Sequence, residues 1–322
     1  MLLLRNAGFF LLTLLILSVL FACSAEQESP LRVGTNIWPG YEPFYLAREL
    51  GYYEQQPVHL VELKSATEVI HAIRNNTIEA AALTIDEAML LLELNIDVCI
   101  IAVTDISNGG DVVLGKPGIK SLSQLKGKRI AVEHTALGAL MLGAMLKKAD
   151  LSINDVLVVP KTVDEHVSAY RKNKVDAVVT FEPYRSILLA EGAQLLFDSR
   201  AIPEQIIDVL VIRKDAVKNH TQSIKTLVHG FFKAAHYLKE KPQDAAKRMA
   251  SRLNLTPEEV LLSYDGLIMP SLNDNKRLFK DKPSHLDKSA QFLLKLMLQE
   301  KLISRAVKID DLFNSQWLPE NL

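Results

Sequence analysis

A set of polar and aromatic side chains lies at or beside the ends of predicted strands, where a folded chain can present them to a ligand. The set consists of Trp38, Tyr41, Thr84, Asp86, Asn108, Asp111, His134, Thr135, Glu182 and Asp208. Aromatic rings with one hydrogen-bonding edge suit a flat organic molecule, and hydroxyl, amide and carboxylate groups suit its polar ends. The chain has no phosphate loop, metalloprotease motif or nucleophile elbow, and its eight histidines form no tight ligand cluster. The pattern predicts a small-molecule binding site with no catalytic residue, cofactor or metal.

The charges at these strand ends are mostly negative. The carboxylates are Asp86, Asp111, Glu133, Glu182 and Asp208, and His134 is the single potential cation among the strand ends considered. A site rich in carboxylates disfavours an inorganic anion and favours an amine or a protonatable ring. The sequence therefore predicts a cationic or zwitterionic ligand that stacks on Trp38.

Several of these positions also have an ordinary structural interpretation. Thr84 or Asp86 is a good N-cap for the helix that follows, and Glu182 precedes a proline that is typical of a first helical position. The paired glycines between Asn108 and Asp111 are also common in a simple loop. Both interpretations stay open at the level of sequence.

Alternating strands and helices must position these side chains. In the first half we expect strands at 31–36, 58–63, 80–83, 98–103 and 112–114, and helices at 42–50, 66–74 and 86–94. A second series predicts strands at 130–133, 156–159, 177–180, 194–197 and 207–212, and helices at 136–148, 164–172 and 183–190. The last third is predicted to be helical at 222–239, 242–252, 257–264 and 284–299. This alternation favours an α/β fold with parallel sheets covered by helices, in which ligands bind beyond the carboxyl ends of strands.

The N-terminal segment predicts export and a lipid anchor. Arg5 precedes an almost unbroken apolar run that ends at Leu20-Phe21-Ala22-Cys23. The run is slightly short for a membrane span, and the four residues resemble a bacterial lipobox. We expect a signal peptide at 1–22, diacylation of Cys23, and a polar tether at 23–30 that holds the protein to the membrane in the periplasm or at the cell surface. An uncleaved anchor or a plain signal peptide is the alternative, and Ser24 leaves inner and outer membrane open.

The composition of the chain excludes other classes. The 322 residues carry a net charge of −1 and no basic run, so nothing indicates a nucleic-acid partner. The only other cysteine, Cys99, lies in an apolar run and is predicted to be a buried thiol. We expect a monomer.

Four segments carry a resemblance to a known family. They are 34–53 (beginning Gly34-Thr35-Asn36-Ile37-Trp38-Pro39-Gly40-Tyr41), 79–84, 121–132 and 175–184 (containing Phe181-Glu182-Pro183-Tyr184). Their order and spacing resemble the substrate-binding proteins of ABC importers for nitrate, sulfonates, taurine and thiamine precursors. The resemblance implies a two-lobed periplasmic-binding-protein fold of type II-like architecture, with the ligand in a cleft between lobes joined by two crossing strands. It implies a first lobe at 31–116 plus 213–322 and a second at 117–212, with crossings near 116–120 and 212–215.

The resemblance also implies a partner and a ligand class. The partner is an ABC permease, and the ligand is a small amine-bearing or zwitterionic compound that is similar to a thiamine precursor or to taurine. Glu133 and His134 differ from the small residues that the family usually has at this turn, which speaks against a sulfonate or nitrate ligand.

Two other functions remain open. A binding protein of this kind can report to a membrane signalling protein instead of a permease, since sensing and import need the same closure. Enzymes that resemble this fold make the thiamine pyrimidine with a lysine-bound pyridoxal phosphate. Lys64 is the candidate for the lysine that would bind this cofactor. The predicted lipid anchor argues against the enzyme, because it places the chain away from cytosolic cofactor.

Overall fold

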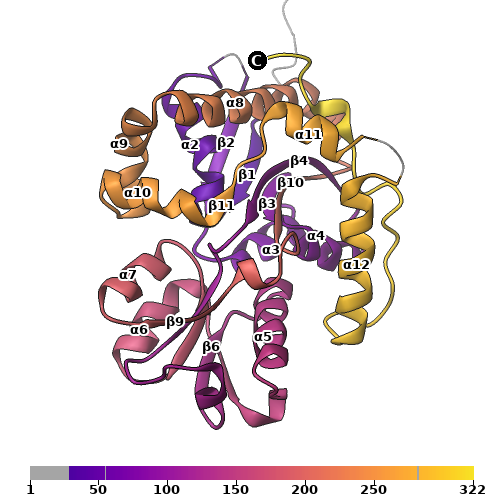
Figure 1. Ribbon diagram of the computed structural model, residues 1–322. Helices are drawn as coiled ribbons and strands as arrows, with labels where there is room; N and C mark the ends of the chain where they lie inside the picture. The colour runs from indigo at the N-terminus through magenta and orange to yellow at the C-terminus, as the bar shows by residue number, and fades with distance from the viewer. Residues whose placement is uncertain (1–28, 55, 281–282) are drawn as a thin grey trace, which may run out of the picture.

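The computed structural model describes residues 29–54, 56–280 and 283–322 (Figure 1). The predicted signal peptide, the lipidation site Cys23 and most of the tether lie outside the described residues. Within the described residues, no helix is both long and apolar enough to cross a membrane.

The first sheet has six strands in the described part of the chain, in the order β11-β4-β10-β3-β1-β2. Its strands are β1 (Leu31–Thr35), β2 (Val58–Glu62), β3 (Ala80–Thr84), β4 (Val98–Ser107), β10 (Ile207–Arg213) and β11 (Leu267–Ile268). β1 runs parallel to β2 and β3, whereas β10 lies antiparallel between β3 and β4. The central strands β3, β4 and β10 are mostly apolar and buried because helices cover this sheet on both faces.

The second sheet has five strands over the same described ranges, in the order β7-β6-β8-β5-β9. Its strands are β5 (Val112–Gly115), β6 (Arg129–Val132), β7 (Leu157–Pro160), β8 (Ala177–Thr180) and β9 (Gln194–Asp198). β6 runs parallel to β7 and β8, and β5 runs antiparallel to β8 and β9. Both sheets are therefore mixed. The expected parallel pairing is found for β1 with β2 and β3 and for β6 with β7 and β8, whereas the strands next to the crossings run antiparallel.

The chain passes from one lobe to the other at earlier residues than the sequence predicts. β5 pairs with β8 in the second sheet, and β10 pairs with β3 and β4 in the first. The chain therefore crosses between β4 and β5 and again between β9 and β10, not near 116–120 and 212–215. The sequence misplaces both boundaries because an apolar strand has the same residue pattern whichever sheet it joins.

Helices pack against both sheets (Figure 1). In the first two thirds of the chain they are α2 (Glu42–Glu49), α3 (Ala66–Arg74), α4 (Ile85–Glu93), α5 (Ala136–Lys148), α6 (His166–Arg171) and α7 (Tyr184–Ala190). The tail forms α8 (Thr221–Glu240), α9 (Pro242–Leu253), α10 (Pro257–Ser263), α11 (Leu272–Leu278) and α12 (His285–Gln299). The predicted α/β elements are present, and two elements are additions: β11 has only two residues, and α11 is mostly polar, so neither produces a hydrophobic period.

The tail packs on the first lobe. Phe231 of α8 stacks against Phe44 of α2 with ring centroids 4.6 Å apart, and both rings are buried. Gly230 lets α8 approach closely, since a Cβ there would lie 2.4 Å from the ring of Tyr53. Cys99 is buried and free, as predicted. The α2–α8 contact thus fixes the helix that follows the Trp38–Tyr41 turn.

We expect Phe231→Ala to destabilise the first lobe by about 3–5 kcal/mol, because it removes a large buried ring and leaves a cavity. Urea denaturation followed by circular dichroism measures the shift. Lys225→Ala on the exposed face of the same helix is the control and should change the midpoint little. Equal effects of the two substitutions would contradict this packing.

Candidate functional site

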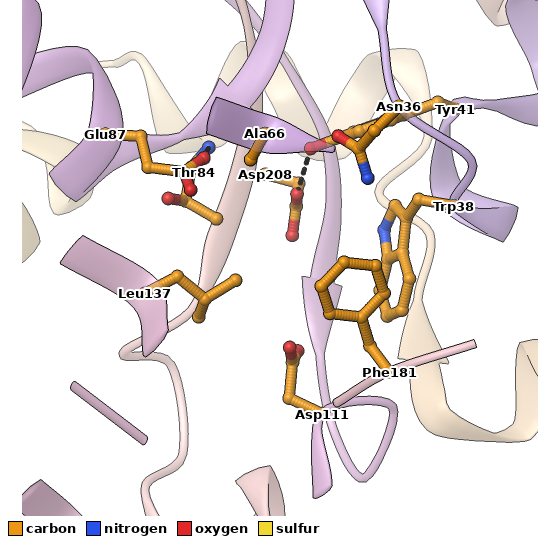
Figure 2. A pocket seen from close by; sticks show the side chains of 10 residues that line it. All are labelled: Asn36, Trp38, Tyr41, Ala66, Thr84, Glu87, Asp111, Leu137, Phe181 and Asp208. Carbon is orange, nitrogen blue, oxygen red and sulfur yellow. Dashed lines mark hydrogen bonds between the residues drawn. The ribbon is translucent and has the colours of Figure 1, made fainter. Parts of the chain in front are cut away.

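Two adjoining chambers lie between the lobes. The residues around the upper chamber are Asn36, Trp38, Tyr41, Ala66, Thr84, Glu87, Asp111, Leu137, Phe181 and Asp208 (Figure 2). The residues around the lower chamber are Ala66, Glu87, Asp111, Glu133, Thr135, Leu137, Gly138, Met141, His166, Val179, Thr180 and Phe181. Each chamber has a cavity volume of about 20 Å³, and the two share five lining residues, so they adjoin each other directly.

The indole of Trp38 is held from several sides in the upper chamber. It follows β1, and its Nε1 donates to the carboxylate of Asp105 at 3.2 and 3.3 Å. Phe181 of the second lobe meets the indole edge to face, with centroids 5.5 Å apart and planes at 85° (Figure 2). A Cβ at Gly110 would lie 2.7 Å from the indole ring, and a Cβ at Gly40 would overlap the Asp105 carboxylate. The ring therefore offers a fixed aromatic surface to a ligand.

Asp208 is the carboxylate opposite Trp38. The hydroxyl of Tyr41 donates to its Oδ1 at 2.5 Å, and both residues line the upper chamber (Figure 2). Burial and the nearby charge of Asp105 raise the pKa of Asp208 well above its ordinary value. Burial likewise raises the pKa of Asp105 to about 7.

The N-terminus of α4 brings a further carboxylate to both chambers. Glu87 Oε2 accepts from the backbone N–H of the N-cap residue Thr84 at 3.1 Å, as a capping box requires. The other oxygen, Glu87 Oε1, has no hydrogen-bond partner among the described residues. Burial and the charge of Asp86 raise the pKa of Glu87 to about 8.

Asp111 contributes a carboxylate at the crossing between the lobes. It is 3% exposed and lines both chambers. Burial and the charge of Asp86 raise its pKa to about 7, although a hydrogen bond with Ser107 acts in the opposite direction. Buried carboxylates are costly without a counter-charge, and no lysine or arginine is among the residues that line the two chambers in the described structure.

Glu133 bridges the two lobes. It follows β6 in the second lobe, and its Oε1 accepts from the backbone N–H and the hydroxyl of Thr67 in α3 at 2.9 and 2.6 Å. Its Oε2 accepts from the backbone N–H of Val163 at 3.3 Å. One carboxylate thus caps a helix of the first lobe from the second lobe, where the helix dipole also favours negative charge.

The structure brings six of the predicted site residues to the chambers: Trp38, Tyr41, Thr84, Asp111, Thr135 and Asp208. Thr135 serves also as the N-cap of α5, where its hydroxyl accepts from Gly138 N–H at 3.1 Å. Asp86 is buried at the N-terminus of α4 but is not part of the lining, and burial raises its pKa to about 6. Asn108 and His134 are exposed and lie outside the lining.

Glu182 has a structural role in place of the predicted binding role. Its carboxylate pairs with Arg185 at 2.6 Å and accepts from the backbone N–H and hydroxyl of Ser186, both at 3.0 Å. It therefore provides a hydrogen-bond acceptor for a backbone N–H at the start of α7, and it does not line either chamber. The helix-capping interpretation of this residue is correct because the partners lie one turn ahead in the same helix.

Sequence reasoning missed several lining or supporting residues. Asp105 had a signal, since it is a carboxylate inside the apolar strand β4. Phe181, Glu87 and His166 carried no such signal, because an aromatic, a capping glutamate and a helical histidine are ordinary at their positions. Lys64, the candidate lysine of the enzyme alternative, is exposed and outside the lining. In the described residues no group of His, Cys, Asp and Glu is arranged to hold a metal ion.

Comparisons with known proteins agree with this architecture. A sequence model of the NMT1-like family matches residues 24–254. A protein of Bacillus subtilis (strain 168), provisionally named an aliphatic sulfonates-binding protein, is 23% identical over 308 residues, which cover 92% of this chain and 90% of the relative. A protein of Haemophilus influenzae, provisionally named a thiamine biosynthesis protein, is 28% identical over 207 residues, 62% of this chain and 63% of its own.

A solved structure shares the fold. The alkanesulfonate-binding protein SsuA from Xanthomonas axonopodis pv. citri, bound to MOPS, superposes with a TM-score of 0.74 at 17% identity, over 90% of this chain and 100% of that protein. The predicted two-lobed periplasmic-binding-protein fold is confirmed.

We expect Glu133→Ala to shift the protein from the closed towards the open form. Hydrogen bonds to a charged group are each worth about 1.5–3 kcal/mol, so the closed population should fall by about tenfold or more. Spin labels on the exposed residues Lys172 and Lys239, one in each lobe, measure the change in distance. Asp164→Asn, an exposed acid in the same segment as Val163, is the control. Unchanged distances in both variants would show that Glu133 does not join the lobes.

We expect Asp111→Asn to stabilise the ligand-free protein more at pH 8 than at pH 5. The folded form keeps the Asp111 proton up to about pH 7, whereas the unfolded chain loses it near pH 4. Between these values a rising pH costs the wild type stability, and asparagine avoids that cost. Melting temperatures at both pH values measure the difference, and the exposed Asp310→Asn should give the same small change at each. A benefit that is larger at pH 5 would contradict the raised pKa.

Proposed function

Since the chain belongs to the NMT1-like family, we propose that it is an extracytoplasmic solute-binding protein of an ABC importer that closes on a small organic cation. The observation that carries the proposal is the set of buried carboxylates around the two chambers without a lysine or arginine among the lining residues. A cationic ligand supplies the missing counter-charge.

The charge of the chambers supports a cation over an anion. Asp208, Asp111 and Glu87 all line the upper chamber, and each has a pKa raised first by burial and then by other carboxylates. An ammonium group or a protonated ring favours their ionised forms, whereas a sulfonate would add to the repulsion. The relatives named for sulfonates therefore indicate the fold and the mode of binding, while the lining residues indicate a different ligand.

The aromatic surface supports a flat ligand. Trp38 and Phe181 come from opposite lobes and meet edge to face beside the carboxylates. A ring against Trp38 gains apolar contact, and a cation next to an indole gains a further attraction of about 0.5–2 kcal/mol. An aromatic amine or an aminopyrimidine satisfies both requirements.

The residues that would contact the ligand come from both lobes, and this explains why binding would bring the lobes together. Trp38, Thr84 and Asp208 belong to strands or turns of the first sheet, whereas Leu137 and Phe181 come from the second lobe. A ligand that touches both groups has a higher affinity for the closed form, and this differential affinity drives closure. Glu133 adds a contact across the lobes, since its carboxylate accepts hydrogen bonds from Thr67 of the first lobe.

The anchoring of the protein is part of the proposal. Lipid on Cys23 would hold the binding protein close to a membrane permease, and the tether at 23–30 would allow it to reach that partner. We infer that the bound ligand is delivered to an ABC permease.

Calorimetric titration tests the ligand class. We expect 4-methylbenzylamine and 4-amino-2-methylpyrimidine to bind, and ethanesulfonate not to bind, with taurine as the zwitterionic comparison. Asp208→Asn should weaken amine binding by about tenfold or more, because it removes one buried partner of the cation. The exposed Asp310→Asn is the matched control and should not change the affinity. Tight binding of ethanesulfonate alone would refute the proposed cation.

A further inference from the structure

The lower chamber holds two buried polar atoms that the cation does not account for. His166 and Thr180 are each 1% exposed and line this chamber. His166 Nδ1 and Thr180 Oγ1 have no hydrogen-bond partner in the described structure. The neighbouring walls are apolar, with Leu137, Met141 and Val179 among them. Unpartnered polar atoms in such surroundings cost free energy and point to a partner that arrives with the ligand.

The tautomer of His166 defines the chemistry of its free nitrogen. Its Nε2 lies 3.2 Å from the backbone carbonyl oxygen of Lys161, which can only accept, so Nε2 carries the hydrogen. Burial lowers the pKa of His166 to about 4, and the ring is therefore neutral at pH 7. Nδ1 is then a hydrogen-bond acceptor, and it needs an O–H or N–H donor.

Thr180 supplies the complementary group. It ends β8, and its hydroxyl can both donate and accept. A hydroxyl group of a ligand can donate to His166 Nδ1 and accept from Thr180 Oγ1, whereas a sulfonate or carboxylate would place one acceptor against another at Nδ1. The chamber is thus suited to a donor and unsuited to an anion.

We propose that the lower chamber recognises a hydroxyl group on the end of the ligand remote from its cationic group. The inference rests on the proposed function, because the ligand must bind with its cationic end among the upper carboxylates. The shared lining residues Glu87, Asp111 and Phe181 make the two chambers continuous, so both ends of one molecule can be bound at once. The predicted substrate class is a small organic cation with a hydroxyl at its opposite end.

A matched pair of probes tests the inference on the wild-type protein. 4-(Hydroxymethyl)benzylamine and 4-methylbenzylamine share a ring and a cation and differ by one hydroxyl. Calorimetry should give the hydroxylated probe an affinity about tenfold higher, since its hydroxyl can make hydrogen bonds with both His166 Nδ1 and Thr180 Oγ1. Equal affinities would overturn the hydroxyl site alone, and binding of neither probe would overturn the proposed cation together with it.

Two variants test which residues distinguish the hydroxylated probe from the methyl probe. Thr180→Val keeps the side-chain shape without the hydroxyl, and His166→Gln can keep the donor to the Lys161 carbonyl without the Nδ1 acceptor. Each should reduce the affinity ratio of the two probes towards one, whereas Ser168→Ala on the exposed side of α6 should keep the wild-type ratio. A wild-type ratio in both chamber variants would overturn the assignment. Circular dichroism checks that each variant folds. If a variant does not fold, the ratio of the two probe affinities on the wild-type protein still tests the proposed hydroxyl site.

Discussion

The burial of several carboxyl groups at the meeting point of the two lobes is the constraint on which the rest of this structure depends. Burial raises the pKa of Asp105, Asp111 and Asp208, and the charges of Asp105 and Asp111 raise the pKa of Asp208 further. The fold accommodates them with single hydrogen-bond donors, such as the indole of Trp38 and the hydroxyl of Tyr41, instead of basic side chains. The same donors fix the two aromatic rings, so that charge and shape in the upper chamber are determined together.

The contact that joins the two lobes lies close to the residues that line the chambers. Glu133 joins α3 of the first lobe to the segment before α6, and His166 is the first residue of α6. The contact between the lobes therefore lies beside the lower chamber, while the aromatic pair lies in the upper one. Under the proposed function, a ligand that contacts both chambers would favour the form in which the lobes are together.

Much of the fold and part of the site follow from local pattern. Helix 66–74 and strand 177–180 have the predicted bounds, because hydrophobic period and capping residues act over a few positions. Trp38, Tyr41 and Asp208 were predictable as site residues, since a carboxylate or a Trp-Pro-Gly-Tyr turn beside a strand end is unusual without a ligand. Glu182 was equally unusual in the sequence, yet its partners Arg185 and Ser186 lie within its own helix start.

The sequence by itself determined the α/β class, the family and the negative sign of the cleft, because these depend on residue types and on their order along the chain. Only the tertiary structure decided which strand joins which sheet, because pairing of β5 and β10 depends on contacts with distant partners. It also decided that Asp105, His166 and Phe181 belong to the site or its support and that Asn108 and His134 do not line it. The direction and burial of a side chain are set by the packing of both lobes, and no local pattern contains that information.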